Sequence, residues 1–146
     1  MTPIAWYPYR KHYLLLHPPA NWSFQIDGLV ERAQVWNWEQ FVKLAPGVKP
    51  EAQSVKFYSG DGVYTDAITM DQAQMDDIMV AVMHDGKPIP ADLGGPVRLV
   101  IPQMYAYKSV KWLNRIELID SDHIGYWEER GYDKDAWLTG ASQARS

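Results

Sequence analysis

The segment Ala91–Trp112, ADLGGPVRLVIPQMYAYKSVKW, constrains the fold of this chain more than any other part of the sequence. Its Gly94 and Gly95, followed by a proline, predict a tight turn because no bulky side chain stands at the bend. The next residues, Val97–Ile101, are rich in β-branched side chains and predict a short buried strand. Pro102 ends this strand because proline has no N–H group to donate to a neighbouring strand. The segment is therefore a turn–strand–loop unit around which a sheet can form.

Cationic and hydroxyl side chains belong to the same unit. An arginine such as Arg98 offers a planar fork of N–H donors, and the later Lys-Ser-Val-Lys run adds ammonium groups and a hydroxyl. If the fold brings Arg98, Ser109 and Lys111 together, they form a site for a phosphate-sized anion. Two alternatives stay open: Arg98 is a paired arginine, or the lysines protect a solvated strand edge. We place Trp112 in the core and at least one tyrosine exposed beside Lys108.

Alternating apolar and polar residues predict three further strands, at residues 22–26, 54–58 and 115–119. In the second of these, Val55 and Phe57 share one face. Strands interrupted by two or three short helices give an α+β domain with a mixed or mainly antiparallel sheet. No glycine-rich loop joins a strand to a helix in the pattern of dinucleotide or P-loop sites, which sets both of those classes aside.

Two of the short helices can be placed on the sequence. Asn37 can cap a helix over Trp38–Ala45. Thr69 and Gln72 form a capping-box pattern that opens a surface helix over Asp71–His84. This second helix would pack on the core through a stripe of apolar residues at helical spacing: Met75, Ile78, Met79 and Val82.

Length and composition indicate one domain with flanking segments. A chain of 146 residues can build one core and not comfortably two. We expect an extended, proline-rich arm over residues 1–20, the folded domain over 21–138 and a flexible tail over 139–146. The formal net charge of −4 gives no reason to expect a nucleic-acid partner. We expect a soluble protein, periplasmic or cytoplasmic, because no transmembrane segment or signal peptide is visible.

The sequence indicates no metal site built from its own side chains. It contains no cysteine, which excludes thiolate ligands and thiol nucleophiles. Its four histidines lie far apart and show no ligand spacing. Glu128 and Glu129 are interpreted as solvated surface charge rather than as an acid–base pair. Tyr64 and Asp66 are candidates to line the mouth of a pocket, and catalytic residues stay unassigned.

Two segments, GGPVRLVIP at residues 94–102 and YAYKSVKW at 105–112, resemble the oxidoreductase molybdopterin-binding domain of sulfite oxidases and of the catalytic subunit of periplasmic methionine-sulfoxide reductase. The likeness extends to FQIDGLVE at 24–31, GVKPEAQSVKFYSGDGVYTDAI at 47–68 and GYWEERGYD at 125–133. It implies a sulfite oxidase-like fold, an oxidoreductase ancestry in oxygen-atom transfer, and molybdopterin as cofactor. The residues that it places against the cofactor are Ser59, Arg98, Ser109, Val110 (through its backbone) and Lys111.

Two departures from the family pattern bear on chemistry. Catalytic relatives bind molybdenum through a cysteine in a CxxGW-like segment, whereas here IDGLVERA leads almost directly to WNWEQF, so we expect that segment to be deleted. Leu93 stands where relatives carry a histidine or asparagine, and its side chain cannot form a hydrogen bond. The resemblance therefore implies molybdopterin binding with molybdenum well below one atom per chain, and reduced or no catalysis.

A cofactor-free interaction or accessory module that kept the fold is the alternative, because a fold persists after its active site is lost. Under either interpretation we expect a redox or membrane protein partner. The sequence leaves open the substrate, the oligomeric state and whether the chain is an enzyme.

Overall fold

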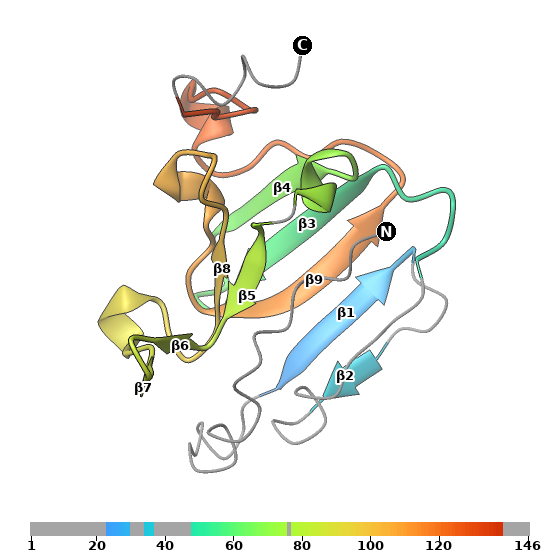
Figure 1. Ribbon diagram of the computed structural model, residues 1–146. Helices are drawn as coiled ribbons and strands as arrows, with labels where there is room; N and C mark the ends of the chain where they lie inside the picture. The colour runs from blue at the N-terminus through green and yellow to red at the C-terminus, as the bar shows by residue number, and fades with distance from the viewer. Residues whose placement is uncertain (1–22, 30–33, 37–47, 76, 139–146) are drawn as a thin grey trace.

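A five-stranded mixed sheet forms the centre of the protein (Figure 1). The computed structural model describes residues 23–29, 34–36, 48–75 and 77–138. The strand order is β2-β1-β9-β3-β4, in which only the β1–β9 pair is parallel. The bounds are β1 Phe24–Gly28, β2 Gln34–Trp36, β3 Ser54–Ser59, β4 Thr65–Thr69 and β9 Leu113–Ile119. The predicted sheet, mixed and mainly antiparallel, is therefore present.

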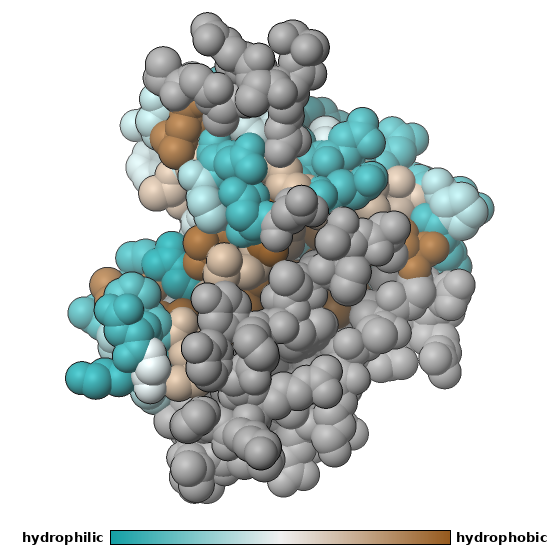
Figure 2. All heavy atoms as spheres, viewed as in Figure 1, coloured by the Kyte–Doolittle hydropathy of each residue, from teal (hydrophilic) through white to brown (hydrophobic). Residues whose placement is uncertain are grey.

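Two short antiparallel ribbons complete the described strands. Strand β5, Met79–Ala81, pairs with β8, Arg98–Val100, and β6, Met83–His84, pairs with β7, Lys87–Pro88. Hydrophilic residues cover the β6–β7 hairpin, and hydrophobic residues gather toward the middle of this face, where Figure 1 draws β5 (Figure 2). The β5–β8 ribbon thus covers apolar surface, whereas the β6–β7 hairpin extends into solvent.

One hydrophobic core joins the sheet to the ribbon and follows from the period-two pattern of the strands. In β3, Val55 and Phe57 are buried on one face, as the alternation predicted. On the opposing side, Leu99 is buried in β8, flanked by Val97 and Ile101, which agrees with the predicted buried strand. Further members of the same core are Phe24, Ile26, Ile68, Met75, Ile78, Met104, Val110, Leu113, Ile116 and Leu118.

The helix predicted over Asp71–His84 is wrong. The capping box does form, because the Thr69 N–H donates to Gln72 Oε1 at 2.9 Å and the Gln72 N–H donates to Thr69 Oγ1 at 3.1 Å. It opens only the 3-10 turn η1, Gln72–Gln74, after which Met75 is extended with ψ 134°. Residues 79–81 then pair with β8, so tertiary strand pairing overrides the local helical pattern.

Among the described residues the helical elements are all single 3-10 turns, so the expected two or three short helices are not found there. Besides η1 they are η2 Ala91–Leu93, η3 Ala106–Lys108 and η4 Glu128–Arg130. The helix expected over Trp38–Ala45, the arm over residues 1–20 and the tail over 139–146 lie outside the described residues. No helix in the described ranges has the length and apolar character needed to cross a membrane.

Trp112 does not lie in the core, contrary to prediction. Its side chain is 39% exposed, and its indole N–H donates to the Ala91 carbonyl at 2.7 Å. Trp112 has a left-handed backbone with φ 51°, and the next residue, Leu113, fills the core at 1% exposure. Tyr105 is exposed, as expected for one tyrosine of this segment.

Candidate functional site

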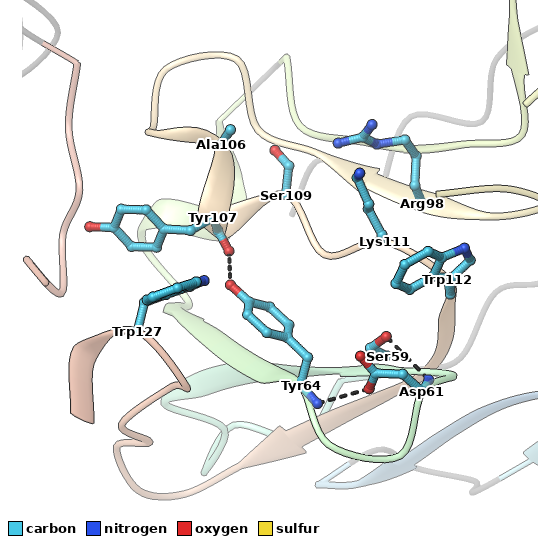
Figure 3. A pocket seen from close by; sticks show the side chains of 10 residues that line it. All are labelled: Ser59, Asp61, Tyr64, Arg98, Ala106, Tyr107, Ser109, Lys111, Trp112 and Trp127. Carbon is cyan, nitrogen blue, oxygen red and sulfur yellow. Dashed lines mark hydrogen bonds between the residues drawn. The ribbon is translucent and has the colours of Figure 1, made fainter. Parts of the chain in front are cut away.

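A pocket of about 250 Å³ opens where the ends of β3 and β8 meet the loops that lead to β4 and β9 (Figure 3). Four of the five predicted cofactor contacts line it, although they come from distant parts of the chain. The complete lining is Ser59, Asp61, Tyr64, Arg98, Ala106, Tyr107, Ser109, Lys111, Trp112 and Trp127. The fold therefore brings Ser59, Arg98, Ser109 and Lys111 together.

Two cations occupy one side of this pocket, as Figure 3 shows for Arg98 and Lys111. Arg98 Nη1 donates to the Leu93 carbonyl at 2.8 Å, and Lys111 Nζ donates to the Asp92 carbonyl at 3.3 Å. Both cations are thus held by consecutive carbonyls of the η2 turn. Within the described part of the chain neither is paired with a carboxylate, so their charge is available to the pocket.

The hydroxyl groups are positioned by backbone N–H donors. Ser109 Oγ accepts from the Ile101 N–H at 2.9 Å, and Ser59 Oγ accepts from the Asp61 N–H at 3.3 Å. Because Ser109 Oγ accepts from the backbone, its own hydrogen can turn toward a ligand, whereas the Ser59 hydroxyl donates to the Asp61 carboxylate. Val110 is buried and its carbonyl accepts from the Leu99 N–H at 2.8 Å, so its side chain belongs to the core behind the pocket.

One carboxylate lies at the other side of the pocket in Figure 3. Asp61 Oδ1 accepts from the N–H groups of Val63 at 2.8 Å and Tyr64 at 2.9 Å and so closes the β3–β4 loop. Burial opposes the charge of this carboxylate, but the hydrogen bonds from Tyr64, Val63 and Ser59 outweigh burial and lower its pKa. Asp61 is therefore ionised at neutral pH, and its carboxylate already accepts hydrogen bonds from Val63, Tyr64 and Ser59.

Aromatic side chains form the wall away from the cations. The Tyr64 hydroxyl donates to the Tyr107 carbonyl, and the Tyr107 hydroxyl donates to the Asp133 carbonyl at 2.5 Å. Burial, with the nearby Asp133 charge, raises the pKa of Tyr107 to about 12. Both phenols are thus neutral near pH 7, and with Trp127 they give the pocket one cationic and one aromatic side.

A buried ion cluster, the Asp66–Lys108–Glu128 triad, lies next to this pocket. Lys108 Nζ contacts Asp66 Oδ1 at 2.8 Å, the Ala67 carbonyl at 3.1 Å and Glu128 Oε1. Exposure of the three side chains is 1%, 1% and 3% for Asp66, Lys108 and Glu128. The solvated-edge interpretation of Lys108 and the surface interpretation of Glu128 are both wrong, because each ion compensates the burial of the other.

The triad holds one more negative than positive charge when both carboxyls are ionised. Asp66 Oδ2 is buried with no hydrogen-bond partner among the described residues. Burial raises the pKa of Asp66 to about 7, and the negative charge of Glu128 adds to this effect against the opposing Lys108 ammonium. A charged residue in the middle of the buried strand β4, next to Ala67 and Ile68, was the sequence signal for this cluster.

The pH dependence of stability should report this raised pKa. The folded pKa of Asp66 lies above its unfolded value of about 4, so the native state binds more protons. The contribution of Asp66 to the free energy of unfolding is therefore fully present below pH 4 and is lost as the pH rises through about 7. We expect Asp66→Asn to remove this downward slope in denaturant unfolding between pH 5 and 8. Asp61→Asn, whose lowered pKa lies outside that window, should keep the slope, and identical slopes in Asp66→Asn and wild type would contradict the assignment.

No group of three or more histidine, cysteine, aspartate or glutamate side chains is arranged to hold a metal ion among the described residues. Two cations, two serine hydroxyl groups and the Asp61 carboxylate line the same pocket.

Comparison with known proteins places this chain in a family. Residues 42–127 match the oxidoreductase molybdopterin binding domain family. The uncharacterized oxidoreductase YuiH of Bacillus subtilis is 36% identical over 126 residues, which cover 84% of this chain and 60% of that protein. The putative protein-methionine-sulfoxide reductase subunit YedZ1 of Azospira oryzae is 32% identical over 101 residues, covering 69% of this chain and 37% of that protein.

More distant matches agree with these relatives. Mitochondrial sulfite oxidase of Rattus norvegicus is 34% identical over 56 residues, or 38% of this chain and 10% of that protein. The sulfane dehydrogenase SoxCD of Paracoccus pantotrophus, at 20% identity, shares the fold with a TM-score of 0.62 over 68% of this chain and 38% of that chain. The chain thus spans about a tenth to three fifths of the length of these proteins. Since the family match covers more than half of its residues, the chain belongs to the oxidoreductase molybdopterin-binding domain family, as its motifs predicted.

Proposed function

We propose that this domain binds molybdopterin and holds the phosphate group of that cofactor with Arg98, Ser109 and Lys111. The observation that carries the proposal is that two cations, neither paired with a carboxylate of the described residues, lie on one side of the pocket. A phosphate there would receive the guanidinium fork of Arg98, the ammonium group of Lys111 and the Ser109 hydroxyl. Ser59 supports the same proposal as a second hydroxyl that lines the pocket, and Val110 is the backbone link between Ser109 and Lys111.

The shape and chemistry of the pocket fit the organic part of the cofactor. A flat heterocycle suits the side formed by Tyr64, Tyr107 and Trp127, because aromatic faces favour stacked or edge-on rings. The phosphate suits the opposite, cationic side. The anchoring of Arg98 and Lys111 on the η2 carbonyls also fixes both cations before a ligand arrives, which lowers the entropy lost on binding.

The residues of this chain fit the metal less well than the pterin. When bound, molybdopterin supplies a molybdenum centre for oxygen-atom transfer, held by the dithiolene of the cofactor. The sequence offers no cysteine thiolate to that centre. Leu93, 47% exposed beside the cations, offers it only an apolar side chain. We therefore assign to this chain binding and orientation of the cofactor, with reduced or no catalysis, and we assign no catalytic residue.

An accessory role without cofactor is the second candidate, and the two departures at the cysteine segment and at Leu93 favour it. The Azospira relative is named as a reductase subunit. On that basis we propose, for either role, a redox or membrane protein partner for this domain.

Anion binding separates the two candidates. We expect the purified protein to bind sulfate, a dianion that does not titrate near pH 7, in calorimetric titration. Arg98→Ala and Lys111→Ala should each weaken binding about tenfold to a hundredfold, because one charge-assisted hydrogen bond contributes about 1.5–3 kcal/mol. Lys87→Ala, which removes an exposed lysine of β7, should leave the affinity unchanged. A wild-type protein that binds no sulfate would leave only the accessory role.

A further inference from the structure

Each member of the buried Asp66–Lys108–Glu128 triad is a sequence neighbour of a residue that lines the pocket. Asp66 of β4 lies two residues after Tyr64, Lys108 stands between Tyr107 and Ser109, and Glu128 follows Trp127. Lys108 therefore ties three pocket-lining segments together from behind through its contacts with both carboxyls. This position makes the triad relevant to whatever the pocket binds.

The carboxyl groups of Asp66 and Glu128 both pack against Gly125. A Cβ atom added at Gly125 would overlap Glu128 Oε2 and lie 2.9 Å from Asp66 Oδ1, so both carboxyls pack directly against this glycine. The Gly125 N–H already donates to Glu128 Oε2. Asp66 Oδ2 keeps no partner among the described residues, and it is the atom at which a proton can be held.

Other titratable groups face the triad and the pocket. They are Tyr64 and Tyr107 on the aromatic side, Arg98 and Lys111 on the cationic side, Asp61 in the β3–β4 loop, and His123. Both phenols have raised pKa values and stay neutral near pH 7. Burial lowers the pKa of His123, helped by the charge of Lys56, so this imidazole is neutral there as well. The carboxyl pair is thus the group among them best placed to exchange a proton when the charge of the pocket changes.

We propose that the Asp66–Lys108–Glu128 triad positions the pocket-lining segments and takes up a proton when a dianion binds in the pocket. The inference rests on the proposed anion site. A dianion bound in the pocket repels the net negative charge that the triad carries when both carboxyls are ionised. This repulsion raises the free energy of the ionised triad, since Coulomb interactions are weakly screened in a buried site. Transfer of one proton from solvent to the Asp66–Glu128 pair makes the triad neutral and removes that repulsion.

Calorimetric titration with sulfate at pH 7.5, in two buffers that differ in ionisation enthalpy, measures the protons taken up. We expect wild type to take up a fraction of one proton per sulfate, and Asp66→Asn to take up none. Asp66→Asn should also bind sulfate about threefold to tenfold more tightly at pH 8, because a negative charge behind the site is gone. A purely structural role for Asp66 predicts weaker binding instead.

Two further variants keep the test decisive. Glu128→Gln should repeat the tighter binding and the loss of proton uptake, and it serves if Asp66→Asn does not fold. His123→Gln, which removes the imidazole near the triad, should keep the wild-type uptake. Sulfate binding without proton uptake, or uptake that persists in both carboxyl variants, would overturn this inference while leaving the anion site intact. No sulfate binding by wild type would overturn the anion site as well.

Discussion

Lys108→Met is expected to lower the free energy of unfolding at pH 8 by about 3–5 kcal/mol, the usual cost of removing one partner from a buried ion pair. Methionine fills most of the space of the lysine stem but offers no charge to Asp66 and Glu128. Both carboxylates would then remain buried without a cation among the described residues. The loss should be smaller at pH 5, because protonation of the carboxyls removes the uncompensated charge.

Denaturant unfolding at pH 5 and pH 8 measures this effect. Lys111→Met is the matched control, since Lys111 is exposed and, among the described residues, its ammonium group contacts the Asp92 carbonyl and the Trp112 ring. Its stability should stay within about 0.5 kcal/mol of wild type. A Lys108→Met protein as stable at pH 8 as the control would show that the triad does not hold the three segments.

Gly95→Ala should be the most disruptive substitution in the turn that precedes β8, with a loss above about 4 kcal/mol. An added Cβ would overlap the carbonyl oxygen of Ile89 and lie 3.1 Å from that of Pro90. The Gly95 N–H donates to the same Pro90 carbonyl at 3.0 Å, so the two backbone segments cannot separate without losing this bond. Because this turn leads directly to Arg98, the variant should also bind sulfate poorly.

Gly131→Ala gives the comparison for that prediction. Gly131 has φ 91°, and an added Cβ would meet no atom within 4 Å. Its substitution should therefore cost only the conformational penalty of about 1–2 kcal/mol. Thermal or denaturant unfolding of the two variants separates steric overlap from backbone strain, and equal losses would show that the Gly95 contact is not close.

The sequence was informative where the structure depends on short segments. The turn at Gly94 and Gly95, the strand at β8 and the Lys-Ser-Val-Lys run lie within one stretch, so their chemistry could be anticipated together. Family resemblance supplied the expectation that Arg98, Ser109 and Lys111 would meet, and they line one pocket. Ser59 joins them from β3, where a β-bulge interrupts the register with β9.

Long-range contacts account for what the sequence did not reveal. The apolar stripe at Met75, Ile78 and Met79 has helical spacing, but residues 79–81 find a strand partner in β8. Lys108 meets Asp66 and Glu128, which lie 42 and 20 residues away in sequence. The residues around Met79 and around Lys108 do not reveal these distant partners, so a helix and a solvated lysine were the natural predictions. Trp112 was placed in the core by its size, whereas its left-handed backbone gives that place to Leu113.

Pterin content of the protein purified from a host that makes molybdopterin tests the central claim most directly. The fluorescence of oxidised pterin released from wild type and from Arg98→Ala/Lys111→Ala measures it, with molybdenum determined on the same samples. We predict pterin in wild type, a large loss in the double variant, and molybdenum well below one atom per chain, because the sequence has no cysteine ligand. Equal pterin in both proteins, or none in wild type, would contradict a cofactor site at Arg98 and Lys111.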